Sequence, residues 1–168
     1  MPEIEVAENL KLQRKHWRIE RIGWCAILLI VLAEVLGAFG GGPFSTAMAV
    51  SPNGSLSAEY ARLSRMTHPS LLQVRIDESA VRGGEVRLWL SRDYVDDMQV
   101  QQVTPQPKSI EIGTGRLTYM FDAAPTSGPL RITFALQAQR MGKIRGAAGL
   151  DSGRAGGTVI RFSQFIFP

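Results

Sequence analysis

SLLQVRIDESAVRGGEVRLWLS, residues Ser70 to Ser91, is the stretch that decides the fold of this chain. Apolar side chains take every second position in two runs of it: Leu72, Val74 and Ile76, then Val86, Leu88 and Leu90. A period of two is typical of a strand with one buried face. Between the runs, residues 77–79 and the glycines at 83 and 84 favour turns. The stretch therefore predicts two strands of a sheet, joined by a short connection.

The same pattern continues toward the C-terminus. Further strands are predicted over residues 99–103, 109–112, 116–121, 130–138 and 158–165, with breaks that are rich in Pro and Gly. Ser91 is placed to cap one helical turn over residues 91–97. Seven or eight short strands at intervals of about ten residues predict an immunoglobulin-like β-sandwich, with a small β-barrel as the alternative.

Two details of this domain are expected from residue type. Trp89 lies on an early strand, and we expect its ring in the core, as in many sandwiches. The segment 141–157 is too rich in glycine for regular structure over its length. It is predicted to be a loop, with a short strand at Lys143–Arg145 as an option.

An apolar run precedes the domain. Residues 22–39 contain a single charged residue, Glu34, and the Gly-Gly-Gly-Pro that follows disfavours further helix. At about 1.5 Å per residue, the run is just long enough to cross a bilayer. We therefore expect four parts: a cytoplasmic basic arm over 1–21, a transmembrane helix over 22–42, a flexible linker over 43–57 and an extracytoplasmic β-sandwich over 58–168.

The charges around the run predict its orientation. Five Lys or Arg precede it by position 21, whereas no charged residue lies between Glu34 and Glu59. Positive charge stays on the cytoplasmic side of a span, so the N-terminus is expected in the cytoplasm. The C-terminal domain is then periplasmic or extracellular, and the bacterial inner (cytoplasmic) membrane is the natural location.

A secretory signal peptide is the competing interpretation. Ala47-Met48-Ala49 has the small residues of a cleavage site, which would release the domain after Ala49. The apolar run is longer than the usual signal-peptide core, Glu34 lies inside it, and acids precede it. These features favour an anchor that is not cleaved.

The span carries a candidate face for association with another helix. Small residues recur every fourth position, at Ala33, Gly37 and Gly41, and Glu34 lies beside them. Small residues let helices approach closely, and a carboxylate is better placed against protein than against lipid. We expect a membrane-embedded protein partner, with a homo-oligomer through the same face as a further option.

The inventory of reactive residues is too small for an enzyme. The single cysteine, Cys25, lies in the apolar run, and His16 and His68 lie on opposite sides of it. The chain has no phosphate-binding loop. The net charge is +4, but the cations are scattered, so no nucleic-acid partner is expected.

Met66 and His68 form the one constellation that suggests a metal. Exported copper carriers use soft Met sulfur and His nitrogen, and these two residues precede Pro69 in a predicted loop. A third ligand is not visible. No cofactor is expected in the leading interpretation, and a periplasmic copper or ligand chaperone using Met66 and His68 is the alternative.

The order of the parts resembles that of small accessory proteins of membrane complexes, among them oxidase-assembly factors that escort copper or cofactors. The resemblance covers the layout of the whole chain and no motif. It implies a non-enzymatic bitopic protein that acts as an accessory or assembly subunit.

Overall fold

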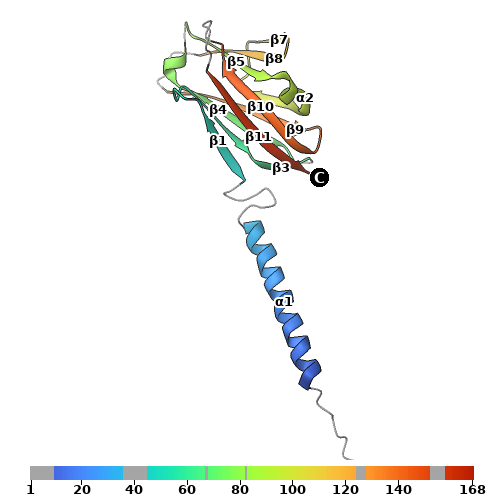
Figure 1. The fold of residues 1–168 in the computed structure, drawn as a ribbon. Coiled ribbons are helices and arrows are strands. Elements are labelled where there is room, and N and C mark those ends of the chain that lie inside the picture. Colours follow the sequence, from blue (N-terminus) through green and yellow to red (C-terminus); the bar gives the residue numbers. More distant parts are fainter. Residues whose placement is uncertain (1–9, 36–44, 67, 82, 124–127, 152–157) are drawn as a thin grey trace, which may run out of the picture.

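The computed structural model describes residues 10–35, 45–66, 68–81, 83–123, 128–151 and 158–168. One long helix precedes an all-β domain (Figure 1). The elements are α1 (Leu10–Val35), β1 (Thr46–Val50), β2 (Leu56–Ala61), β3 (Leu63–Arg65), β4 (Ser70–Ile76), the 3₁₀ helix η1 (Glu78–Ala80), β5 (Glu85–Ser91), α2 (Arg92–Asp97), β6 (Met98–Thr104), β7 (Ser109–Gly113), β8 (Arg116–Asp122), β9 (Leu130–Ala138), β10 (Gly142–Leu150) and β11 (Val159–Phe167).

The strands form two sheets that pack into a β-sandwich. Sheet A has the order β1-β2-β4-β9-β6, and sheet B has the order β3-β11-β10-β5-β8-β7. All pairs are antiparallel except β3 with β11. The predicted sandwich is confirmed in this form, as two sheets and not as one closed sheet.

Alternation of apolar residues builds the core between the sheets. Along β4 and β5, inward positions are buried and outward positions are exposed or half-buried. One edge-to-face ring pair, Tyr119 with Phe134, joins the two sheets, and a second, Tyr94 with Phe162, joins α2 to β11. Among the described residues, every buried member of the core cluster lies between Leu56 and Ile166, and none belongs to α1.

The turn between the first two predicted strands has the expected chemistry. Asp77 caps η1 by accepting hydrogen bonds from the backbone N–H and the hydroxyl of Ser79. The Ser79 hydroxyl, followed by its N–H, lowers the pKa of the Asp77 carboxyl. Gly83 and Gly84 both have positive φ, which other residues rarely adopt.

The strand count and the domain boundary need correction. Eleven strands lie in the described part of the chain, against the seven or eight predicted. β1 lies inside the predicted linker 43–57, and β2 begins before residue 58, so the sandwich starts earlier than expected. The sequence TAMAV is uncharged and contains two alanines, which suggests a linker, yet it pairs with β2 at the edge of sheet A.

Two predictions inside the domain are wrong. Residues 142–150 form the full strand β10 and not a loop. Two of its glycines, Gly146 and Gly149, face rings of β11, α2 and β5, where a larger residue would not fit. Trp89 lies half-buried on the outer face of sheet B and not in the core. Its ring covers Gly149, where a Cβ atom would come within 2.6 Å of the indole.

The helix begins earlier than the predicted span. α1 starts at Leu10, within the predicted arm 1–21, and is described as far as Val35. Residues 36–42 of the predicted span lie outside the described residues, as do residues 1–9 of the arm. Within the described ranges, no helix combines the length and the hydropathy needed to cross a membrane.

Candidate functional site

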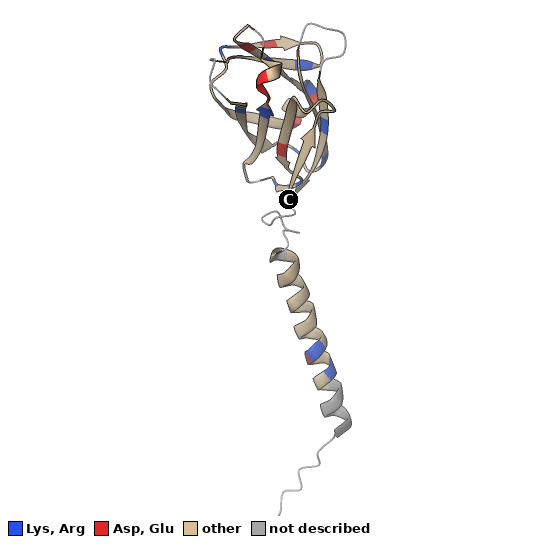
Figure 2. Cartoon of the chain, turned by 90° about the vertical axis from the view of Figure 1, so that its left-hand side faces the viewer, with Lys and Arg blue, Asp and Glu red and all other residues tan. Residues whose placement is uncertain are grey.

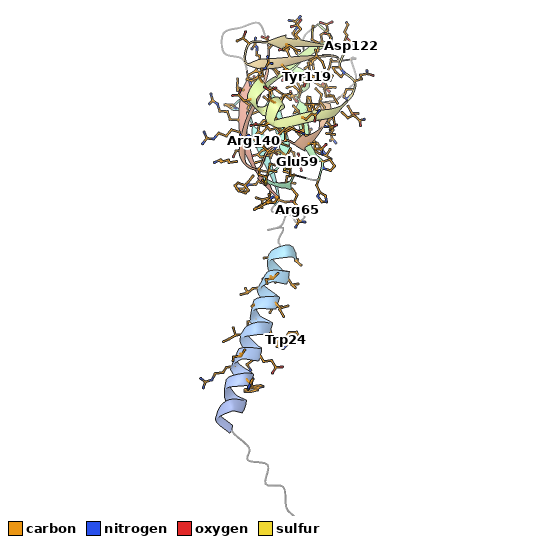
Figure 3. The ribbon with its side chains drawn as sticks, turned by 90° about the vertical axis from the view of Figure 1, so that its right-hand side faces the viewer. Trp24, Glu59, Arg65, Tyr119, Asp122 and Arg140 are labelled. Atoms are coloured by element: carbon orange, nitrogen blue, oxygen red, sulfur yellow. The ribbon has the colours of Figure 1, made fainter. Side chains whose placement is uncertain are left out.

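The apolar surface of α1 is the most unusual feature of the described chain. Each of its large apolar side chains from Trp17 onward is more than half exposed: Trp17, Ile19, Ile22, Trp24, Ile27, Leu28, Leu29, Ile30, Val31, Leu32 and Val35. They point to all sides of the helix (Figure 3). A helix that is apolar all round is normally buried in protein or lipid. The described part of the sandwich leaves this surface of α1 uncovered.

Charge and apolar surface are separated along α1. In Figure 2 the coloured charges of the helix lie in its N-terminal half, and the rest is uncharged where it is coloured. Arg21 lies 3.7 Å above the centre of the Trp17 ring, a cation–π contact one turn apart. Trp17 and Trp24 thus mark the boundary between the charged and the apolar part.

The structure reaches only part of the predicted helix face. Ala33 is half-buried, and Glu34 belongs to the last described turn of α1. Gly37 and Gly41 lie outside the described residues. The predicted interaction through Ala33, Glu34, Gly37 and Gly41 therefore stays a prediction.

His68 lines a pocket at one end of the sandwich. The pocket has a volume of about 560 Å³, and residues from β1, β2, β3 and β4 form its walls. Arg65, Glu59 and Gln73 contribute polar side chains. The buried hydroxyl of Ser70 also belongs to the lining and has no hydrogen-bond partner among the described residues.

Met66 and His68 have different surroundings. Met66 is half-buried and packs against the core, and its N–H donates a hydrogen bond to the carbonyl of Phe167. His68 is exposed, and Met66 does not line the pocket that His68 lines. In the described ranges, no three His, Cys, Asp or Glu side chains gather as metal ligands. A copper site would rest on these two side chains.

A second groove lies between two edge strands. It has a volume of about 1040 Å³ and runs between β6 of sheet A and β7 and β8 of sheet B. Its apolar lining includes Val100, Val103, Ile110 and Leu117. Ile110 and its neighbour Ile112 are at least half exposed on β7. The sandwich therefore offers apolar surface beside two unpaired strand edges.

The best-placed carboxylates are engaged in surface ion pairs. Asp97 accepts two hydrogen bonds from Arg140, at 2.6 and 2.7 Å, and these bonds raise the pKa of the guanidinium. Asp96 pairs with Arg92 one turn away on α2. Hydrogen bonds to Glu85, then to Asp122, raise the pKa of Lys108. These acids serve as structural contacts.

Sequence reasoning missed a surface on sheet B that we call the basic face. It consists of four exposed cations and two rings on three adjacent strands: Arg65 on β3, Arg161, Phe165 and Phe167 on β11, and Lys143 and Arg145 on β10. In the sequence these cations look scattered. The alternation along 159–167 was visible, but the interpretation of 141–157 as a loop hid the strand that completes the surface.

Comparison with known proteins does not assign the chain to a family. No protein-family model matches the chain, and no curated protein matches it.

Proposed function

We propose that this protein is a non-enzymatic bitopic membrane protein that acts as an accessory or assembly subunit of a membrane protein complex. The observation that carries the proposal is the exposed apolar surface of α1 beside a sandwich that has a core of its own. Such a helix is stable when lipid or another helix covers it. The run to Phe39 supplies the length, and the charges of the N-terminal half favour a cytoplasmic N-terminus.

An uncleaved anchor fits the position of β1. Cleavage after Ala49 would remove four of the five residues of β1, which pair in register with Tyr60, Glu59 and Ala58 of β2 and with Ala61. The edge of sheet A would then lose most of a strand. The anchor therefore keeps the sandwich at the outer surface of the bacterial inner membrane, where its grooves meet a partner.

Replacing Glu34 tests the association of the helix. Glu34→Leu should leave membrane insertion intact and reduce recovery of a membrane partner, or of an untagged second copy, with the tagged chain. An apolar side chain in place of the carboxylate removes the hydrogen bond or ion pair that a polar intramembrane residue makes with a neighbouring helix. The measurement is quantitative mass spectrometry after purification in mild detergent.

The matched control lies on the other side of the same helix. Leu32 is about 160° from Glu34 around the axis, at 100° per residue, so Leu32→Ala should leave recovery unchanged. Equal recovery with Glu34→Leu and with the unmodified chain would contradict the association through this face.

The copper alternative has its own test. In a Cys25→Ala background, which removes the only thiol, copper(I) is titrated into the purified chain and into its Met66→Ala and His68→Ala variants. We expect equal and weak binding in all three, because Met66 packs against the core and His68 lines a different surface. A loss of affinity of tenfold or more in both variants would favour the chaperone.

A further inference from the structure

We propose that the basic face of sheet B docks on the surface of an anionic phospholipid bilayer and lays the sandwich against the membrane. The inference rests on the proposed function, because it needs a chain that is anchored in the bilayer. In this arrangement the folded domain makes a second contact with the membrane, besides that of the helix.

Strand pairing makes the basic face continuous. Phe165 lies between Lys143 of β10 and Leu63 of β3, and Phe167 lies beside Arg65. Opposite residues of paired strands have Cβ atoms about 5 Å apart. The cations and the rings therefore lie together on the outer face of three neighbouring strands.

The charge of this face is of one sign. β3, β10 and β11 contain no Asp or Glu. In the part of the chain that the structure describes, no ion pair involves Arg65, Lys143, Arg145 or Arg161. By contrast, Lys108, Arg116 and Arg140 elsewhere on the sandwich are each paired with an acid. The four cations are thus available to lipid phosphates, and each adds about fivefold to binding at an anionic surface.

Two rings add an apolar contact in the middle of the charges. The rings of Phe165 and Phe167 meet edge to face with centres 4.9 Å apart, and Phe165 is 43% exposed. Aromatic and apolar side chains flanked by cations are typical of surfaces that enter the headgroup region. They distinguish this face from an ordinary solvated charged surface.

The basic face adjoins the point where the sandwich joins its tether. The carbonyl of Ser45 accepts a hydrogen bond from the Arg62 N–H, and the Arg62 carbonyl accepts one from the Phe165 N–H. Two hydrogen bonds thus connect the first described residue of the domain with the centre of the face. Figure 3 shows Arg65 at this end of the sandwich and Asp122 at the far end.

The tether explains why lipid is favoured over an acidic protein. The predicted span ends at residue 42, and only residues 43–44 separate it from the first described residue of the domain, so an anchored helix keeps the face near the headgroups. A short tether raises the effective concentration of the surface, and weak contacts then suffice. An acidic partner protein would have to displace the bilayer from this position.

The experiment compares two lysines of the same molecule. The full chain is reconstituted in nanodiscs of zwitterionic lipid or of the same lipid with about 30% anionic phosphatidylglycerol, and an amine-acylating reagent is applied. Lys143 lies on the basic face, whereas Lys108 lies at the β7–β8 end of sheet B. We expect acylation of Lys143 to be about fivefold slower in anionic discs and to recover in about 0.5 M salt, with Lys108 unchanged.

Charge-reversal variants separate the basic face from net charge. Arg65→Glu with Arg145→Glu should abolish the protection of Lys143. The matched control is Arg75→Glu with Arg131→Glu, because these exposed arginines lie opposite each other on sheet A. This pair changes the net charge equally and should leave the protection intact. Circular dichroism verifies that both variants fold.

The outcomes distinguish the inference from the proposed function. A chain that alkaline carbonate extracts from bilayers of either composition overturns the membrane anchor and this inference together. If the chain is inserted but Lys143 is acylated equally fast in both kinds of disc, the inference alone is overturned. The basic face is then either solvated or a site for an acidic protein. Loss of protection in the Arg75 and Arg131 variant also overturns it, since net charge would then be the cause.

Discussion

Two arginines in the apolar C-terminal half of α1 should release the protein from the membrane. Ile30 and Val31 lie near the centre of the predicted span, and both side chains are more than half exposed. An arginine at the centre of a spanning helix costs about 3 kcal/mol of insertion free energy, so the pair Ile30→Arg with Val31→Arg costs about 6 kcal/mol. We expect the variant to move from the membrane pellet to the soluble fraction after carbonate extraction.

The control carries the same charge on apolar residues of the sandwich that are even more exposed. Met48 on β1 and Ile112 on β7 are 66% and 72% exposed. Met48→Arg with Ile112→Arg should remain in the pellet, because neither side chain belongs to the helix. A helix variant that stays in the pellet under carbonate would contradict the anchor.

Strong alternation made much of the sandwich predictable. β4 and β5 have apolar residues at every second position, and the structure buries those positions. β9 was predicted with its observed bounds, Leu130–Ala138. β7 and β8 each extend one residue beyond the prediction at their C-terminal end, and β6 extends one residue beyond it at both ends. In these segments local preference and burial point to the same structure.

Two of the strands that were not predicted, β1 and β10, have sequences that give a weak local signal for a strand. β1 is short and uncharged, without the polar–apolar alternation of β4 and β5, and it pairs with β2 at the edge of sheet A. β10 contains Gly146 and Gly149, which weaken a strand in isolation. The structure shows why glycine stands at these two positions, because rings of residues that are distant in the sequence lie against them.

Of the two candidate surfaces, the apolar surface of α1 could be predicted from the sequence and the basic face could not. The apolar character of α1 follows from the sequence alone, and the structure adds that no part of the sandwich covers it. The basic face could not be predicted, because Arg65, Lys143 and Arg161 are far apart in sequence. Only the order β3-β11-β10 brings them together.

A valine at Gly146 should destabilise the sandwich although valine favours strands. A Cβ atom at this position would lie 2.6 Å from Phe162 and 2.8 Å from Tyr94. Neither ring can move aside freely, since both are buried, they meet edge to face, and Gln164 donates a 3.1 Å hydrogen bond to the Tyr94 hydroxyl. Overpacking of this kind lowers the free energy of unfolding by about 1–3 kcal/mol. We expect Gly146→Val to lose about 3 kcal/mol of this free energy and Gly146→Ala to lose about 1 kcal/mol. Urea unfolding followed by near-ultraviolet circular dichroism measures both losses.

Two comparisons show that the rings are the cause. Gly113 on β7 has an ordinary contact of 3.5 Å at its Cβ position, so Gly113→Val should be neutral or raise the free energy of unfolding by up to about 1 kcal/mol. Adding Phe162→Leu to Gly146→Ala removes the ring nearest to the new methyl group. The double variant should therefore lose less unfolding free energy than Gly146→Ala and Phe162→Leu lose together, because the effects of substitutions at residues in contact are not additive. Losses that add up strictly would contradict the contact between the new methyl group and the Phe162 ring. Stabilisation by Gly146→Val would show that the strand preference of valine outweighs packing at this position.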